Sequence, residues 1–154
     1  MPVGIFEGFD GEWSHVSRRL IALAEATPPD KFTWRPAQGV YSTSEIYMHI
    51  AMANFWLLSA IGASLPADVK DGMEKSVTSK PDVIDWLKRS LEAVEKAHLA
   101  ATPEELARAV HIAKRDATAD NIYLRIILHT NEHMGQLVGY ARMTGITPPW
   151  SKHP

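Results

Sequence analysis

The chain has 154 residues, 45% of them hydrophobic and 22% charged, which indicates one globular domain spanning residues 1–154. Its formal charge of −2 argues against a nucleic-acid partner, because binding to phosphates requires a basic face and no run of Lys and Arg supplies one. The absence of cysteine excludes disulfides, thiolate metal ligands and a cysteine nucleophile.

The sequence also lacks the features of a secreted or membrane protein. The first residues, MPVGIFEGFDGEW, contain neither the basic nor the apolar region of a secretory signal. No apolar run approaches the roughly 20 residues that a membrane span needs. Together with the absence of cysteine, these features favour a soluble, cytoplasmic protein that does not bind membranes.

The first half of the chain contains two predicted helices. The first covers residues 9–26, where apolar residues recur at helical spacing, and prolines end it. Residues 31–42 read as a loop. The second helix begins at the capping box formed by Ser42 and Glu45 and continues to about Ile61.

The second half contains two more predicted helices and a less certain stretch between them. After a polar connection over residues 62–80, a helix starts near Pro81, a residue suited to a first turn. A second capping-box pattern predicts a short extra helical turn near 102–107, and residues 107–117 fit either an extended or a helical form. The last helix is expected to start after Asp120.

Gly145 is a fitting end for this last helix, because glycine accepts the left-handed conformation that follows many helices. The chain shows no convincing strand pattern and no internal repeat. Four helices of this length predict an all-α fold, a four-helix bundle.

Three histidines stand where apolar residues are expected. His129 and His133 are four residues apart on the stripe of Ile126 and Leu137, and His49 lies on the buried stripe of the second helix. Two imidazoles one turn apart can bind one metal ion, and the third can complete the set from a facing helix. A metal also relieves the cost of burying unpaired imidazoles.

Other readings of the histidines stay open at this point. The three can instead be hydrogen-bonded core histidines, or can line a wet end of the bundle. His98 ends the third helix and is expected to interact with the helix dipole there. Surface or loop positions are expected for the remaining histidines, which are His15, His111 and His153.

Residues 129–133 also spell H-x-x-E-H, the pattern of the inverzincin proteases. Such a site needs a further carboxylate ligand, and residues 134–154 contain no Asp or Glu. The protease hypothesis is therefore unfavourable, and Glu132 reads as a charge on the helix surface.

Two blocks resemble the DinB-like superfamily. They are FTWRPAQGVYSTSEIYMHIAMANFW at residues 32–56 and HTNEHMGQLVGYARMTGITPPWS at residues 129–151, with one histidine on the second helix and H-x-x-x-H followed by Gly-Gln on the last. The resemblance implies a four-helix bundle of up-down-down-up order, often a homodimer. It implies a divalent metal held by His49, His129 and His133. The metal stays open, because three imidazoles suit zinc, nickel, iron or copper, of which Zn, Ni or Fe is expected.

The resemblance also implies a class of reaction. Characterised members of the superfamily include transferases that join low-molecular-weight thiols, such as bacillithiol or mycothiol, to electrophiles. A metal-dependent thiol S-transferase acting on small electrophiles is therefore the leading hypothesis, with Glu45 and Gln136 as candidates for orienting ligand rings or substrate. The alternative for Glu45 is that its capping box uses the carboxylate entirely. The alternatives are a metal-dependent hydrolase and a non-catalytic, stress-associated metal-binding protein.

Overall fold

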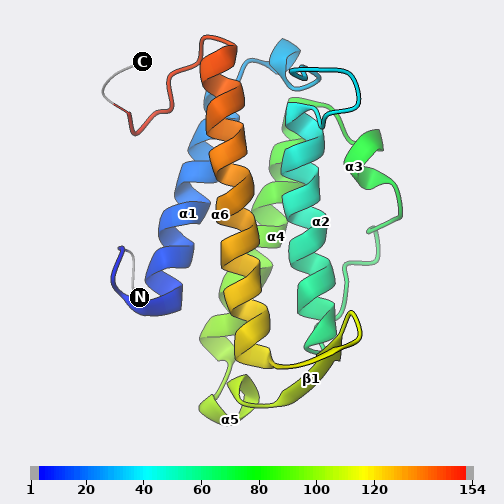
Figure 1. Ribbon diagram of the computed structural model, residues 1–154, viewed down its shortest axis with the longest axis vertical. Coiled ribbons are helices and arrows are strands. Elements are labelled where there is room, and N and C mark those ends of the chain that lie inside the picture. The colour runs from blue at the N-terminus through cyan, green and yellow to red at the C-terminus, as the bar shows by residue number, and fades with distance from the viewer. Residues whose placement is uncertain (1–3, 152–154) are drawn as a thin grey trace.

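The computed structural model describes residues 4–151 and shows a four-helix bundle of up-down-down-up order (Figure 1). The long helices are α1 (Gly8–Ala26), α2 (Thr43–Ala60), α4 (Lys80–Ala100) and α6 (Ala119–Met143). Helices α1 and α2 each contact both α4 and α6, so the four helices close into a ring. The all-α prediction is confirmed. No helix among the described residues is both long and apolar enough to span a bilayer.

Short elements fill the connections between the long helices. They are the 3-10 turn η1 (Pro29–Lys31), the helices α3 (Met73–Ser76) and α5 (Pro103–Leu106), and the strands β1 (Ala109–Ile112) and β2 (Arg115–Thr118). The predicted turn near 102–107 is therefore present as α5. Of the two forms left open for residues 107–117, the extended one is present: β1 and β2 form an antiparallel hairpin, although the sequence showed no convincing strand pattern.

The hairpin was hard to foresee because its turn uses unusual residues. A two-residue turn links Ile112 to Arg115, and its central residues Ala113 and Lys114 have φ of 50° and 64°. Such turns normally carry Asn-Gly or Gly-Gly, since non-glycine residues resist positive φ. The sequence therefore lacks the glycine that usually indicates such a turn, although Ala113 and Lys114 do adopt the positive φ that the turn requires.

Local side-chain contacts set the helix ends. The capping box of Ser42 and Glu45 begins α2, as predicted, with the Ser42 backbone N–H 2.6 Å from the Glu45 carboxylate. Helix α6 begins two residues earlier than expected, because Thr118 caps it through a box in which Asn121 takes the place of Glu. At the other end Gly145 adopts φ of 79°, which closes the helix.

The connection between α2 and α4 runs the full length of the bundle, because these two helices point the same way (Figure 1). The sequence suggested a plain polar loop over residues 62–80, but the segment contains α3, which packs on α2. Met73 anchors α3, with only 8% of its surface exposed. This anchor holds the adjacent Glu74 beside α2.

A buried chain of hydrogen bonds ties three helices together near the histidines. The Thr130 hydroxyl donates to the Asn54 side-chain oxygen (3.4 Å), and the Asn54 amide donates to the Ser90 hydroxyl (3.3 Å). All three residues are fully buried within the apolar core. Since Thr130 directly follows His129, the chain helps to fix how α6 faces α2.

Candidate metal centre

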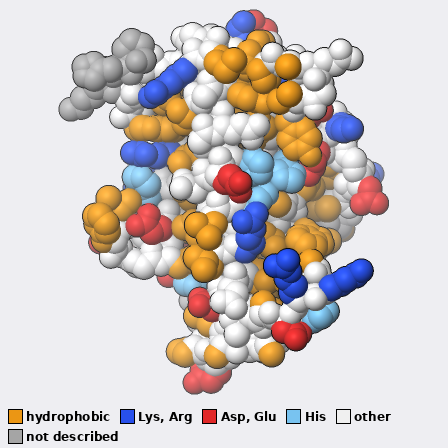
Figure 2. All heavy atoms as spheres, in the orientation of Figure 1, with side chains coloured by type: hydrophobic (Ala, Val, Ile, Leu, Met, Phe, Trp, Pro, Cys, Tyr) orange, Lys and Arg blue, Asp and Glu red, His pale blue; other side chains and the backbone are white. Residues whose placement is uncertain are grey.

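The structure brings the three predicted histidines together between α2 and α6. His49 comes from α2, and His129 and His133 lie one turn apart on α6. Their ring centres are 4.6–4.9 Å apart, and one nitrogen of each ring lies within 4.8 Å of the other two. This cluster can hold a metal ion, and Figure 2 shows histidine side chains at the surface near the middle of this face.

Glu74 fixes the orientation of the His49 ring. Its carboxylate lies 2.9 Å from Nδ1 of His49, and a carboxylate can only accept, so Nδ1 carries the proton. In the neutral ring Nε2 then has a free lone pair, which points toward His129. This carboxylate–histidine arrangement is the usual outer support of a metal-binding imidazole.

The His133 ring is fixed by a chain of hydrogen bonds along α6. The side-chain oxygen of Gln136 accepts from Nδ1 of His133 (3.1 Å), and the Gln136 amide donates to the Tyr140 hydroxyl (3.4 Å). The Tyr140 hydroxyl donates in turn to the Tyr41 carbonyl (2.8 Å). Because the Gln136 oxygen can only accept, Nδ1 of His133 carries the proton, and in the neutral ring Nε2 keeps a free lone pair.

His129 is the most buried of the three rings. Burial, followed by the charges of His133 and His49, lowers the pKa of His129 to about 4. The ring is therefore neutral near pH 7, the form that binds metal. Its Nδ1 is buried and has no hydrogen-bond partner within residues 4–151.

The donor set fits a divalent cation. Nε2 of His49 and Nε2 of His129 are 3.0 Å apart, close to the roughly 3.3 Å between two nitrogens that each lie about 2.0 Å from one tetrahedral ion. With the proton of His49 placed on Nδ1, two lone pairs would face each other unless His129 donates from Nε2. A cation held by the three rings would remove this repulsion, and three protein ligands would leave at least one coordination position available.

A cavity of about 690 Å³ adjoins the cluster. His49 and His129 form part of its wall, and the rest comes from α2, the β1–β2 hairpin and the first half of α6. Its size falls in the usual range of small-molecule sites, and most of its lining is apolar. The hairpin that the sequence did not reveal is therefore one wall of the candidate site.

The Glu45 carboxylate has partners other than the histidines, in contrast to its candidate role of orienting their rings. Its carboxylate accepts from the Ser42 backbone and forms an ion pair with Arg35 at 3.2 Å. Burial raises the pKa of Glu45, but the hydrogen bonds from Ser42 and Arg35 outweigh it, so the pKa lies below its usual value. The carboxylate stays charged and serves the start of α2.

Glu74 is the contact that the sequence did not indicate. It lies on a connection without periodicity, so no pattern linked it to His49 across 25 residues. Only the path of the connection could have suggested this contact, because a segment that joins two parallel helices must run along the length of the bundle. By contrast, Gln136 was identified because it lies three residues after His133 on the same helix.

The remaining histidines stand apart from the cluster. His98 donates from Nδ1 to the Asp10 carboxylate of α1 (2.7 Å) and packs against Phe9, so it joins two helices in addition to ending one. His111 is exposed on the hairpin beside Asp116, and His15 is partly buried on α1. His153 lies outside the described residues.

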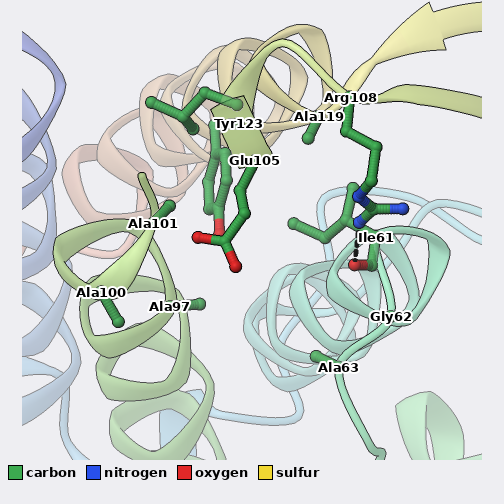
Figure 3. Close-up of a pocket in the computed structure, with 11 residues that line it drawn as sticks. Ile61, Gly62, Ala63, Ala97, Ala100, Ala101, Glu105, Arg108, Ala119 and Tyr123 are labelled. Carbon is green, nitrogen blue, oxygen red and sulfur yellow. Dashed lines mark hydrogen bonds between the residues drawn. The ribbon is translucent and has the colours of Figure 1, made fainter. Parts of the chain in front are cut away.

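A second cavity, of about 280 Å³, lies at the opposite end of α2 from its capping box (Figure 3). Glu105 and Tyr123 point into it, and Arg108 donates to the Ile61 carbonyl at 2.6 Å. Glu105 also caps α5 through Thr102. The polar groups here have structural roles, and no histidine lines this cavity.

The four-helix bundle and the histidine cluster together define the class of protein, which is a small helical protein with a candidate metal centre. The profile of the DinB superfamily matches residues 12–137, and the chain belongs to this superfamily. A DinB-like protein from Bacillus cereus is similar in structure, with a TM-score of 0.82, 22% identity, and 95% of this chain and 97% of the other covered.

A DinB-like protein from Bacillus subtilis shows the same fold, with a TM-score of 0.71 and 18% identity over 90% of this chain and 93% of the other. No curated protein matches the sequence significantly.

Proposed function

We propose that His49, His129 and His133 hold one divalent ion, Zn, Ni or Fe, and that the protein is a metal-dependent thiol S-transferase of small electrophiles. The observation that carries the proposal is the convergence of three imidazoles, two of which donate from Nδ1 to outer hydrogen-bond partners so that Nε2 faces the cluster. Three imidazoles suit any of these metals, so the supply in the cell decides among them.

The bound ion would supply one chemical effect, which is to favour the thiolate form of a low-molecular-weight thiol at neutral pH. The residues of the chain would do the rest. Glu74 and Gln136 would keep the rings of His49 and His133 oriented, and the cavity beside α2 would hold the electrophile away from bulk water. The thiolate would form the new bond to carbon as the leaving group departs with its electron pair.

The test is a transfer assay with metal-loaded protein, several thiols and a generic electrophile such as chlorodinitrobenzene. We expect a rate above the uncatalysed reaction with at least one thiol, which falls to background in His133→Ala. His111→Ala is the matched control, because this histidine is exposed on the hairpin and lies outside the cluster. Background rates with every thiol would overturn the transferase proposal.

Two other outcomes of the same experiment would assign a different function. Chelator-sensitive turnover of an ester or amide without thiol would identify a hydrolase that uses the same histidines to activate water. Stoichiometric metal with no turnover of either kind would identify a metal-binding protein without catalysis. Both outcomes keep the metal centre and reject the transferase.

A further inference from the structure

Two arginines line the cavity beside the histidine cluster and come from different elements. Arg115 lies on β2 and Arg125 on α6. On the face that holds the histidines, Figure 2 shows Lys and Arg side chains close beside them. The cavity therefore has cationic groups on two of its walls in addition to the candidate metal site.

The other polar groups of the cavity are already used. The Asp116 carboxylate lies 2.9 Å from Nδ1 of His111, and the Asn121 side chain accepts from the Thr118 backbone in the cap of α6. The cavity is left with two positive groups and one carboxylate that has its own partner.

Both guanidinium groups are free to turn toward a ligand. The carboxylate nearest Arg125 is that of Glu132, 3.9 Å away, and both side chains are more than half exposed (55% and 67%), so this ion pair contributes little. Arg115 pairs with Ile112 through the strand backbone, and its guanidinium group has no hydrogen-bond or ion-pair partner among the residues that the structure describes. Neither group has to break a strong contact to bind an anion.

The remaining wall of the cavity is apolar. It is formed by Trp56 and Leu57 of α2, Ile112 of β1 and Ile122 of α6. Trp56 is 55% exposed and borders the cavity, so it offers a large apolar surface to a ligand. A ligand that buries itself here needs an apolar body as well as a charged group.

We infer that the cavity takes a small amphipathic acid, whose carboxylate or phosphate is bound by Arg115 and Arg125 and whose apolar body packs against Trp56 and Ile112. Arginine is suited to this role because its planar fork can give two parallel hydrogen bonds to either oxyanion. The inference rests on the proposed function only in taking this cavity as the substrate side of the metal centre.

The experiment compares three probes that share one apolar body: 4-phenylbutyrate, 4-phenylbutyl phosphate and 4-phenylbutanol. Binding is measured by calorimetry to the full chain, both metal-free and zinc-loaded. The metal-free arm is essential, because without zinc an acid can gain affinity only from the protein itself. The two acids distinguish a carboxylate from a phosphate as the preferred group.

The variants are Arg115→Gln and Arg125→Gln, each with a matched control on the same segment or helix. Lys114→Gln removes a positive charge from the hairpin turn, and Arg142→Gln removes one from α6, and neither residue lines the cavity. We expect at least one acid to bind about tenfold more tightly than the alcohol, and to lose about tenfold in either arginine variant but little in the controls.

Three results would overturn the inference: no binding of either acid to the wild type, equal affinity for the alcohol, or equal losses in the control variants. Arg115→Lys and Arg125→Lys keep the positive charge but lose the planar guanidinium, so we expect an intermediate loss of affinity. These variants also test the inference if a glutamine variant folds poorly. Arginine-dependent binding to the metal-free protein would support the inference even if the transferase assay gave only background rates. Failure of the inference can therefore be distinguished from failure of the proposed function.

Discussion

The Glu74 carboxylate lies 2.9 Å from Nδ1 of His49, although 25 residues separate them in the chain. A four-residue helix in a long connection is thus coupled to the candidate metal centre. The contact assigns the proton of His49 to Nδ1 and turns Nε2 inward. It gives the crossover between α2 and α4 a role beyond linking two helices.

Replacing Glu74 should weaken metal binding without unfolding the protein. Outer-sphere partners of metal-binding histidines typically contribute roughly 10- to 100-fold to affinity, so we expect a loss in this range for Glu74→Ala and a smaller one for Glu74→Gln. Competition with a chromophoric chelator measures the affinity. Glu132→Gln, an exposed carboxylate on α6, is the control, and an equal loss there would show that only net charge matters.

Gln136 should act in the same way on His133. Gln136→Met keeps the length of the side chain but removes the acceptor for Nδ1, and we expect metal affinity to fall about tenfold. Tyr140→Phe removes only the far end of the hydrogen-bond chain and should have a smaller effect. Unchanged affinity in Gln136→Met would mean that packing alone orients the His133 ring.

The low pKa of His129 makes the metal-free protein sensitive to acid. The value falls from 6.5 to about 4 on folding, mainly through burial, so between these values the unfolded chain binds more protons than the folded one. The stability from this group is complete above about pH 6.5 and is lost as the pH falls toward 4.

Urea denaturation of metal-free protein at about pH 7.5 and about pH 4.5 measures this loss. We expect a smaller decrease in stability for His129→Gln than for the wild type, because glutamine does not titrate in this range. An NMR titration of the His129 ring provides a direct check. A midpoint near the ordinary histidine value would contradict the account.

The sequence was most informative where one helix face carries the pattern. The stripe of α6 placed His129 and His133 together, and the stripe of α2 turned His49 toward the interior. Capping residues located the start of α2 and α5 because Ser or Thr is followed by Glu at the third position. The start of α6 was misplaced because Asn121 fills that position.

Features that depend on contacts across the chain were not visible in the same way. Glu45 occupied the expected place one turn before His49, but its own helix cap and Arg35 use its carboxylate. Glu74 reaches His49 only because α3 packs on α2, and the hairpin turns at Ala113-Lys114 without a glycine signal. Tertiary packing decides such contacts, and local propensity does not report it.

The strained hairpin turn offers a test of the fold. Lys114 has φ of 64°, so Lys114→Gly should relieve strain and raise stability by about 1 kcal/mol. The same substitution at Lys96, inside the C-terminal half of α4, should lower stability by about 1 kcal/mol. Thermal or urea denaturation compares the two, and destabilisation by both would argue against the left-handed turn.

The most direct test of the metal centre is the metal content of tag-free wild type, His49→Ala, His129→Ala and His133→Ala after dialysis. We predict about one divalent ion per chain in the wild type and near-complete loss in each of the three variants, with His111→Ala unchanged. Circular dichroism should show that every variant stays helical, because the core does not depend on the ion. Metal retained in any one of the three variants, or absent from the wild type, would contradict a centre built from these imidazoles.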